Sequence, residues 1–286
     1  MNAKIANQSH KTAIVTGAAR GMGRAMAAGL LRAGYAVAAV DNHAPSLEEL
    51  MSAMRAEGRD QSLLTIEIDL TRPDAAAEIL SRSVARFGQV DILVNNAGIG
   101  RDSIWQDNWK HKHSFFDIQP DQWRRFFEVN VHAHFMMVHT IVPRMIEQGW
   151  GRVVANTTSL STMLVRGGAP YGQPKAAHES MMAAMSAELE GTGVTANVLV
   201  PGGLTNTSMV TPTTPVPRSE MIQPEAMVPP LLWLISDDAA DINAQRIVAR
   251  RWDMNIPPRE ALKLAGAPIG WSTAGSEAVR PLPVIT

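Results

Sequence analysis

The sequence predicts a single-domain α/β protein with a doubly wound parallel sheet and helices on both faces. Three observations predict this fold. Short apolar runs of strand length alternate with longer segments of helical pattern. The short runs are apolar and contain β-branched residues, as expected for strands that are buried on both faces. The length of 286 residues is suitable for one domain of this class.

The first half of the chain opens with an apolar strand, a glycine-rich turn and a helix, and the alternation then repeats. The strands are short and apolar, whereas the helices are longer and have helical periodicity. The strands expected in this half are Thr12–Thr16, Ala36–Val40, Leu64–Ile68 and Ile92–Val94. The expected helices are Gly23–Ala33, Ser46–Glu57 and Ala75–Phe87.

The second half continues the pattern with longer helices. The expected elements are a helix over Asp121–Met145, a strand over Gly151–Thr157, a helix over Tyr171–Glu190 and a strand over Val194–Val200. Two segments interrupt the alternation: 99–119 is polar and aromatic, and 203–224 is rich in Thr and Pro. We expect both to be substrate loops of one catalytic domain, residues 1–252. Residues 253–286 are expected to pack, as a C-terminal extension, on the body or on a neighbouring subunit.

Composition excludes several classes of function. The formal net charge is −1, so electrostatics give no reason to expect a nucleic acid or a membrane surface as partner. The chain has no cysteine, which excludes disulfides, thiol catalysis and thiolate metal sites. No apolar run approaches the ~20 residues that span a bilayer. The first eleven residues lack the apolar core of a secretory signal, and we expect a cytoplasmic protein.

A glycine-rich turn between the first strand and the first helix predicts a dinucleotide site. Gly17, Gly21 and Gly23 allow a tight turn and a close approach of the pyrophosphate to the backbone. The free N–H groups at the start of the helix favour the same negative charge. Arg20 and Met22 stand between the glycines and are expected to line the site.

Asp41 predicts which dinucleotide is bound. It ends the second strand about twenty residues beyond the turn, where a carboxylate accepts hydrogen bonds from ribose hydroxyls. The same carboxylate would repel a 2′-phosphate. NAD is therefore favoured over NADP, and Arg20 weakens this preference only slightly.

Five further motifs occur in a fixed order. Asp69 follows the third strand, Asn95-Asn96-Ala97-Gly98 follows the fourth, and Asn130 lies in the next helix. Tyr171 and Lys175 begin a later helix, and Pro201-Gly202 follows the sixth strand. With the glycine turn at residues 16–23, these motifs closely resemble the classical short-chain dehydrogenase/reductase family over roughly residues 10–250. The resemblance implies a Rossmann-type fold and, in most relatives, a homo-oligomer, either a tetramer or a dimer.

The resemblance also implies roles for individual residues. Asp69 and Leu70 would flank the adenine, and Asn96 and Ala97, followed by Gly98, would lie along the cofactor. Pro201 and Gly202 would line the nicotinamide. Asn130 would hold a water molecule of a proton relay, and Lys175 would bind the nicotinamide ribose.

Tyr171 and Lys175 carry the predicted chemistry. Hydride transfer to a ketone creates an alkoxide that needs a proton, and a phenol can donate it. Since the two residues are four apart on a helix, they share one face. The positive charge of Lys175 should therefore lower the pKa of the Tyr171 phenol from its usual value near ~10.

A hydroxyl group should polarise the carbonyl, and two neighbouring residues compete for this role. The usual family spacing of thirteen residues before Tyr171 reaches Thr158. The family residue is normally serine, and Ser159 is one step away. The residue type favours Ser159, with Thr158 as the alternative.

Other polar and aromatic groups were considered as sites. His111, His113, His132, His134 and His139 lack the spacing of a metal motif, and we expect surface or packing histidines and no metal. Trp105, Trp109, Phe115 and Phe116 lie in a segment longer than the family usually has there, where they either contact substrate or anchor the insertion.

Together these features predict an NAD-dependent oxidoreductase that interconverts a secondary alcohol and its ketone. The small-molecule substrate is not specified by the sequence. The alternative is a non-catalytic NAD(P)-binding sensor or scaffold on the same fold, because fold alone does not imply catalysis. Asn130, Tyr171 and Lys175 are all intact, which argues for the enzyme.

Overall fold

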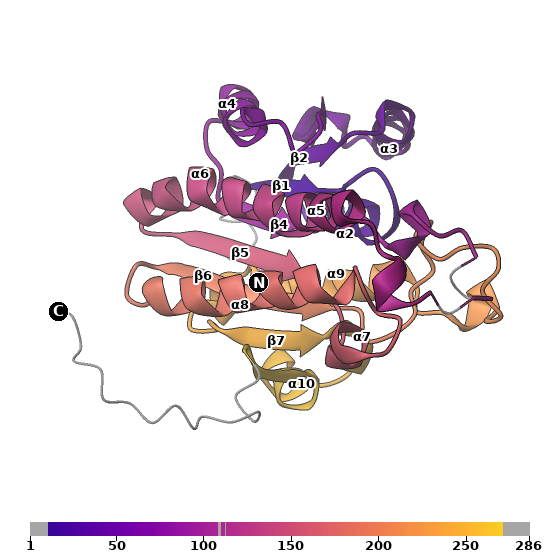
Figure 1. Cartoon of the computed structure of the whole chain (residues 1–286). Coiled ribbons are helices and arrows are strands. Elements are labelled where there is room, and N and C mark those ends of the chain that lie inside the picture. Colours follow the sequence, from indigo (N-terminus) through magenta and orange to yellow (C-terminus); the bar gives the residue numbers. More distant parts are fainter. Residues whose placement is uncertain (1–10, 108–109, 112, 271–286) are drawn as a thin grey trace, which may run out of the picture.

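The computed structural model describes residues 11–107, 110–111 and 113–270. In this part of the chain one sheet of eight strands has the order β3-β2-β1-β4-β5-β6-β7-β8 (Figure 1). The strands are β1 (Thr12–Thr16), β2 (Ala36–Asp41), β3 (Leu63–Glu67), β4 (Ile92–Asn95), β5 (Gly151–Asn156), β6 (Val194–Val200), β7 (Gln245–Val248) and β8 (Gly266–Pro268). Pairing is parallel from β3 to β7, and β8 is antiparallel to β7.

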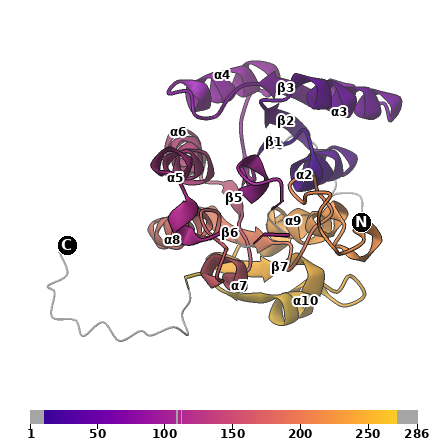
Figure 2. The same ribbon diagram turned by 45° about the vertical axis from the view of Figure 1, so that its right-hand side comes forward.

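Helices cover both faces of the sheet, which confirms the predicted fold class. The α-helices are α2 (Gly21–Arg32), α3 (Ala44–Ala56), α4 (Ala75–Phe87), α5 (Pro120–Phe127), α6 (Ala133–Gln148), α7 (Leu160–Leu164), α8 (Gly172–Glu188), α9 (Val228–Leu234) and α10 (Pro258–Ala265). One face packs against α2, α3 and α9, and the other against α4, α6 and α8 (Figure 2). Residues of β1, β5 and β6 are buried throughout, as continuous apolar strands require.

The helix expected over Asp121–Met145 is not continuous. A π-helical turn over Glu128–His132 separates α5 from α6, and Asn130 lies at its centre. Such turns insert one extra residue into a helix and often occur at functional sites. Apolar periodicity continues through the turn, so the sequence gives no sign of it.

The sheet also gains two strands that were not predicted. β7 is only four residues long and has two apolar members, and β8 has three residues. They form because β6 leaves an open edge on which β7 and then β8 pair. Residues 253–270 of the expected extension therefore pack on the body through α10 and β8, where Ala261 and Ala265 are buried. Residues 271–286 lie outside the described part of the chain.

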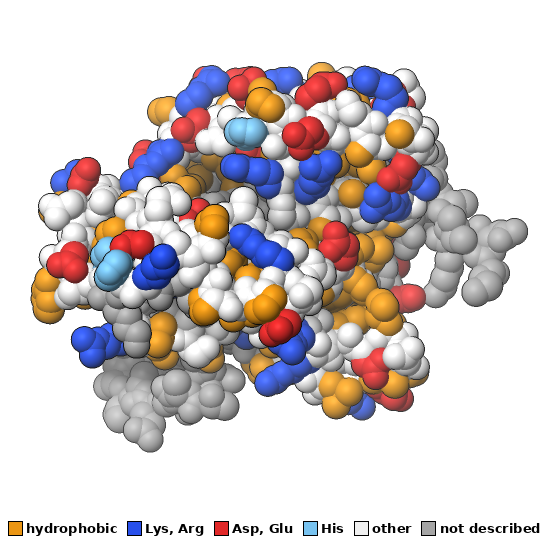
Figure 3. Space-filling model, turned by 90° about the vertical axis from the view of Figure 1, so that its right-hand side faces the viewer, with side chains coloured by type: hydrophobic (Ala, Val, Ile, Leu, Met, Phe, Trp, Pro, Cys, Tyr) orange, Lys and Arg blue, Asp and Glu red, His pale blue; other side chains and the backbone are white. Residues whose placement is uncertain are grey.

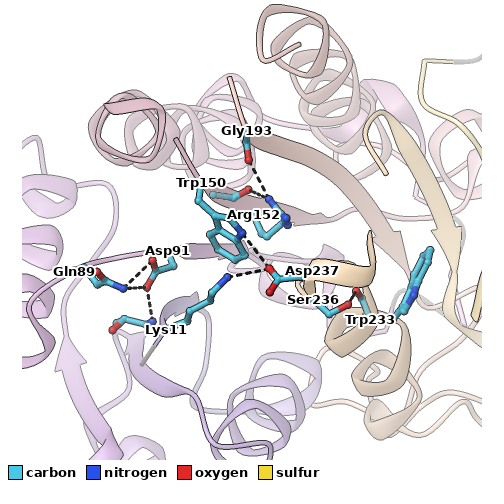
Figure 4. A network of polar contacts seen from close by, with 11 residues as sticks. Lys11, Gln89, Asp91, Trp150, Arg152, Gly193, Trp233, Ser236 and Asp237 are labelled. Carbon is cyan, nitrogen blue, oxygen red and sulfur yellow. Dashed lines mark hydrogen bonds and ion pairs between the residues drawn. The ribbon is translucent and has the colours of Figure 1, made fainter. Parts of the chain in front are cut away.

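A polar cluster lies at the amino-terminal ends of the central strands (Figure 4). The Trp150 ring lies between the Lys11 Nζ, 3.0 Å from its centroid, and the Arg152 guanidinium at 4.2 Å. Both Trp150 Nε1 and Lys11 Nζ donate to Asp237 Oδ1, each at 3.3 Å. Asp91 Oδ2 accepts from the N–H of Thr12 at 2.8 Å. The cluster thus joins the starts of β1, β4 and β5 to the segment after α9, and we assign it to the scaffold.

Candidate active site

A cavity opens at the carboxyl ends of the strands, where β1 and β4 lie side by side. Chain order reverses between these strands, and α/β folds bind ligands at such a point. The cavity has a volume of about 320 Å³. Its lining includes thirteen residues predicted for the cofactor: Gly17, Arg20, Gly21, Met22, Gly23, Asp41, Asp69, Leu70, Asn96, Ala97, Gly98, Tyr171 and Lys175. The structure therefore brings together residues that are up to 158 positions apart in the sequence.

The glycine turn is built for a close backbone approach. Gly17 has a φ of +65°, and a Cβ there would lie 2.7 Å from the Ala97 Cα. A Cβ on Gly23 would lie 2.0 Å from the Gly17 carbonyl oxygen. The Asn96 Nδ2 fixes the turn by donating to the carbonyls of Thr16 at 2.9 Å and Gly17 at 3.1 Å. Helix α2 begins beside this turn at Gly21, so its free N–H groups face the cavity.

Two carboxylates lie at the other end of the cavity. Asp41 accepts from the N–H groups of Ala19 at 3.0 Å and His43 at 3.1 Å, which fixes it at the end of β2. Asp69 accepts from the Thr71 N–H and hydroxyl, and Arg125 Nη2 lies 3.5 Å from it. Burial alone would raise the pKa of Asp69, but the Thr71 bonds and the Arg125 charge together lower it.

Arg125 is a lining residue that the sequence interpretation missed. It comes from α5 and contacts both Asp69 and, at 3.2 Å, the Thr71 hydroxyl. Figure 3, which faces this edge of the sheet, shows basic side chains gathered near the centre of the face. Arg20 and Arg125 both line the cavity, so an anionic ligand meets positive charge there. Two adjacent basic residues in the last turn of α5, Arg124 and Arg125, were the available signal. The lining residues that were not predicted individually are Asn42, Ile68, Ile99, Val129, Asn156, Thr207, Ser208 and Met209, of which Ile99 and residues 207–209 belong to the segments predicted as substrate loops.

Five of the predicted residues are not among the described residues that line this cavity, namely Asn130, Thr158, Ser159, Pro201 and Gly202. Pro201 and Gly202 follow β6 but do not line this cavity. Asn130 is fully buried, and its amide makes two bonds to the Ile99 backbone, at 2.9 and 3.0 Å. A Cβ on Gly98 would lie 2.7 Å from Asn130 Oδ1 and 3.6 Å from Lys175 Nζ. Asn130 and Lys175 therefore approach the same point of the backbone.

Tyr171 and Lys175 stand at the start of α8. Tyr171 immediately precedes the helix and Lys175 lies in its first turn, with Nζ 5.9 Å from the Tyr171 ring centroid. The Lys175 ammonium donates to the Asn156 carbonyl oxygen at 2.9 Å. Burial lowers the pKa of Lys175 to about 8.

The pKa of Tyr171 moves in the direction opposite to the one expected. Although the residue is partly exposed to the cavity, burial raises the pKa of its phenol to about 12. The Asp102 carboxylate raises it further, and the Arg101 guanidinium partly offsets this. Lys175 does not lower the phenol pKa here because its ammonium points to the Asn156 carbonyl.

Thr158 and Ser159 lie in the loop between β5 and α7. The Ser159 hydroxyl is 3.0 Å from the Ser161 hydroxyl and 2.8 Å from that of Thr162. Ser159 is also the residue that caps α7. The Thr158 carbonyl accepts from Arg246 Nη2 at 2.6 Å. The Ser159 hydroxyl is thus engaged within its own helix.

Two of the described histidines are buried in the core, and two others are exposed on the surface. His134 and His178 are fully buried and stack with centroids 4.3 Å apart, and burial lowers the pKa of His134 to about 3, which keeps it neutral. His132, at the end of the π-helical turn, and His139 on α6 are exposed, and both stack on Phe135. In the described ranges no three His, Cys, Asp or Glu residues are grouped as a metal site requires.

The two segments predicted as substrate loops meet beside the cavity. The Thr213 hydroxyl donates to the Gln106 carbonyl at 3.4 Å, and a Cβ on Gly100 would touch Met209. Trp105 stacks on His113, and the Phe116 side chain is 91% exposed. Trp109 lies outside the described residues. Within residues 99–119, Trp105 therefore packs within the insertion, whereas Phe116 is exposed to solvent.

Comparison with known proteins identifies the family. The family described as short chain dehydrogenase matches residues 11–216. A short chain dehydrogenase of Pseudocercospora fijiensis is 36% identical over 68% of this chain and 60% of its own length. The 3-oxoacyl-[acyl-carrier-protein] reductase of Staphylococcus epidermidis is 30% identical over 68% of this chain and 75% of its own. The chain belongs to the short-chain dehydrogenase/reductase family of oxidoreductases, in its classical form.

Two further similarities extend the comparison. The 1-deoxy-11-beta-hydroxypentalenate dehydrogenase of Streptomyces exfoliatus is 32% identical over 67% of this chain. The match spans 60% of the Pseudocercospora protein and 66% of the Streptomyces one. The structure of a putative NAD(P) dependent gluconate 5-dehydrogenase from Beutenbergia cavernae, with bound NADP, superposes with a TM-score of 0.70 at 29% identity, covering 84% of this chain and 94% of its own. No helix in the described residues is both long and apolar enough to cross a membrane.

Proposed function

We propose that this protein is an NAD-dependent dehydrogenase that interconverts a secondary alcohol and its ketone. One observation carries the proposal: Tyr171 and Lys175 lie on the same cavity as the glycine turn and Asp41. The proposed proton donor, Tyr171, and the glycine turn expected to bind a dinucleotide thus line the same cavity. The proposal includes the cytoplasm as location and a homo-oligomer, tetramer or dimer. Phe135, 46% exposed on α6, supports a subunit contact because an exposed aromatic side chain is stabilised by burial.

The cavity residues fit a nicotinamide dinucleotide. A Cβ on Gly17 or Gly23 would collide with the protein's own backbone, so the tight turn beside the start of α2 requires glycine at both positions. The α2 N–H groups would hold the pyrophosphate, Asp41 the adenosine ribose, and Asp69 and Leu70 the adenine. When bound, the nicotinamide supplies the hydride acceptor or donor. Asp41 supports NAD, whereas the NADP in the Beutenbergia structure makes a direct comparison of both cofactors necessary.

Tyr171 is the proposed acid and base. With a pKa of about 12 its phenol is protonated at neutral pH, and it can give that proton to the substrate oxygen during ketone reduction. In alcohol oxidation the phenolic oxygen must instead take the proton. Lys175, with a pKa of about 8, is mostly charged at neutral pH, and we assign it to the nicotinamide ribose.

The residue type favours Ser159 in the sequence; from the contacts of the two residues we instead propose Thr158 as the carbonyl-polarising hydroxyl, with Ser159 as the alternative. Two observations support Thr158. It has the family spacing to Tyr171, and the Ser159 hydroxyl already bonds to Ser161 and Thr162. Threonine provides the same O–H donor as serine.

The deciding experiment is a spectrophotometric assay of cofactor reduction. NAD or NADP is offered with propan-2-ol, cyclohexanol, 1-phenylethanol, gluconate and a 3-hydroxyacyl thioester, and the reverse reaction uses the matching ketones. Turnover that is lost in Tyr171→Phe supports the enzyme. Tight binding of NADH without turnover of any member would instead favour the sensor or scaffold.

A further inference from the structure

Helix α8 carries a buried carboxylate two turns beyond the catalytic tyrosine. Glu179 is fully buried, and with Tyr171 and Lys175 it completes a series at intervals of four residues, which places all three on one side of the helix. The Glu179 Oε1 accepts from Arg246 Nε at 2.9 Å, and its Oε2 accepts from the Thr157 hydroxyl at 2.8 Å. Each carboxylate oxygen therefore holds a different element.

Arg246 completes the link from β7. Its side chain is 12% exposed, and its guanidinium bonds in two directions. The Nε donates to Glu179, and the Nη2 donates to the Thr158 carbonyl oxygen at 2.6 Å. The planar guanidinium fixes the angle between these two bonds, which a lysine ammonium on a flexible stem cannot do.

These contacts fix the backbone on both sides of the Thr158 Cα. Before it, the Thr157 hydroxyl is held by Glu179, and the Thr157 N–H donates to the Leu199 carbonyl of β6 at 3.3 Å. After it, the Thr158 carbonyl is held by Arg246. With both neighbouring peptides held, the direction of the Thr158 Cα–Cβ bond is set relative to α8, the helix that begins at Tyr171.

Stability alone does not require charges at these two positions. Replacing a buried ion pair by apolar residues of similar volume is often neutral or stabilising. The pair instead provides three directed bonds that an apolar pair cannot make. We propose that Glu179 and Arg246 are positioning residues, which hold the Thr158 hydroxyl in register with Tyr171 for polarisation of the substrate carbonyl. This inference rests on the proposed function of the site.

The first test is Arg246→Lys, which keeps a positive charge opposite Glu179 but removes the planar guanidinium that donates to Glu179 and to the Thr158 carbonyl. The fastest secondary alcohol of the panel serves as substrate. We expect kcat to fall about tenfold to a hundredfold, because displacement of a reacting group by about 1 Å costs about 10² in rate. The dissociation constant for NADH, followed by fluorescence, should stay within twofold of the parent. Arg259→Lys is the matched control, since Arg259 also bonds a carboxylate (Asp241) and a backbone carbonyl (Asp238), but on the surface. The kcat of Arg259→Lys should equal that of the parent.

A double variant separates positioning from folding. Glu179→Leu with Arg246→Leu replaces the pair by apolar side chains, and we expect a folded protein that binds NADH yet has a similarly reduced kcat. The effects of Arg246→Lys and Thr158→Ala on kcat should not multiply. In a Thr158→Ala background, Arg246→Lys should lower kcat by less than a further twofold, because the hydroxyl that Arg246 positions is already absent.

The outcomes are separable. Arg246→Lys with parental kcat, while Thr158→Ala is strongly impaired, overturns the positioning role and leaves the proposed function intact. Losses that multiply fully in Thr158→Ala/Arg246→Lys also overturn it, because Arg246 would then act through another group. If Thr158→Ala keeps parental kcat, Thr158 is not the donor and the inference fails with that assignment. Retention of activity by Tyr171→Phe would refute the proposed function itself.

Discussion

Replacing the buried Lys175 by methionine should stabilise the fold at neutral pH while removing catalysis. Lys175 is 3% exposed, and its ammonium has one bond, to the Asn156 carbonyl. Burial lowers its pKa from 10.5 to about 8, so the folded protein holds the charged form less favourably than the unfolded chain does. Methionine has a similar shape and no charge, so it relieves this penalty.

The size of the effect follows from the pKa. A decrease from 10.5 to about 8 corresponds to about 3 kcal/mol, at about 1.4 kcal/mol per pH unit. The lost hydrogen bond offsets about 1 kcal/mol. We therefore expect Lys175→Met to raise the free energy of unfolding by about 2 kcal/mol at pH 7.

The pH dependence gives the sharper test. Between pH 8 and 10.5 the unfolded chain binds more protons at Lys175 than the folded chain does, so the stability of the parent rises with pH in this window. Below pH 8 the penalty is fully present, and above 10.5 it is absent. The advantage of Lys175→Met should therefore shrink as the pH rises from 8 toward 10.5.

Urea unfolding at pH 7, 8.5 and 10, followed by tryptophan fluorescence, measures this difference. Lys263→Met on α10 is the control, since it makes the same substitution at an exposed lysine. A parent that is more stable than Lys175→Met at pH 7, or a difference that stays constant from pH 7 to 10, would refute the reasoning. Lys175→Met should also lose most of its turnover, so that the variant is more stable than the parent but less active.

Four further outcomes are expected. Tyr171→Phe should keep NADH binding but lose about 10²–10⁴ in kcat, and more than a tenth of the parental rate would contradict its acid–base role. Asp41→Ala should raise the ratio of kcat/KM for NADP to that for NAD, and an unchanged ratio would remove Asp41 from cofactor selection. Thr158→Ala should lower kcat by about 10²–10³ and Ser159→Ala much less; the reverse ranking would assign the donor to Ser159. Truncation after Asp253 should lower the melting temperature because β7 loses its partner β8 and α10 is removed; an unchanged melting temperature would show that the extension does not stabilise the body.

Much of the fold and the cofactor cavity could be predicted because both depend on local patterns. The apolar runs that form β1, β4, β5 and β6 are buried on both faces, which leaves little choice of register. Parallel strands end at one edge, so Asp41 after β2 and Asn96 after β4 had to lie near the glycine turn. The π-helical turn at Asn130 was not predictable, since its extra residue leaves the apolar period of the flanking helices intact.

The pKa of Tyr171 shows where spacing is insufficient. The interval of four residues correctly places Lys175 near the phenol, at 5.9 Å from the ring centroid. It does not reveal that the Asn156 carbonyl takes the ammonium, or that Asp102 raises the phenol pKa. Both groups come from other strands and loops, so their effect is fixed by tertiary packing and not by the helix.

The inward face of α8 explains why Glu179 was missed. Apolarity would turn the helix so that its methionines and alanines face the sheet, yet of its three methionines only Met182 is fully buried, and Ala184 is exposed. The buried positions at helical spacing instead include Lys175, His178 and Glu179. Burial of charge is unfavourable unless each charge is paired and hydrogen-bonded. A charged stripe on the face that packs against a sheet therefore marks side chains kept for what they hold, and on α8 that stripe runs from Lys175 to the Glu179 carboxylate, which accepts from the Thr157 hydroxyl.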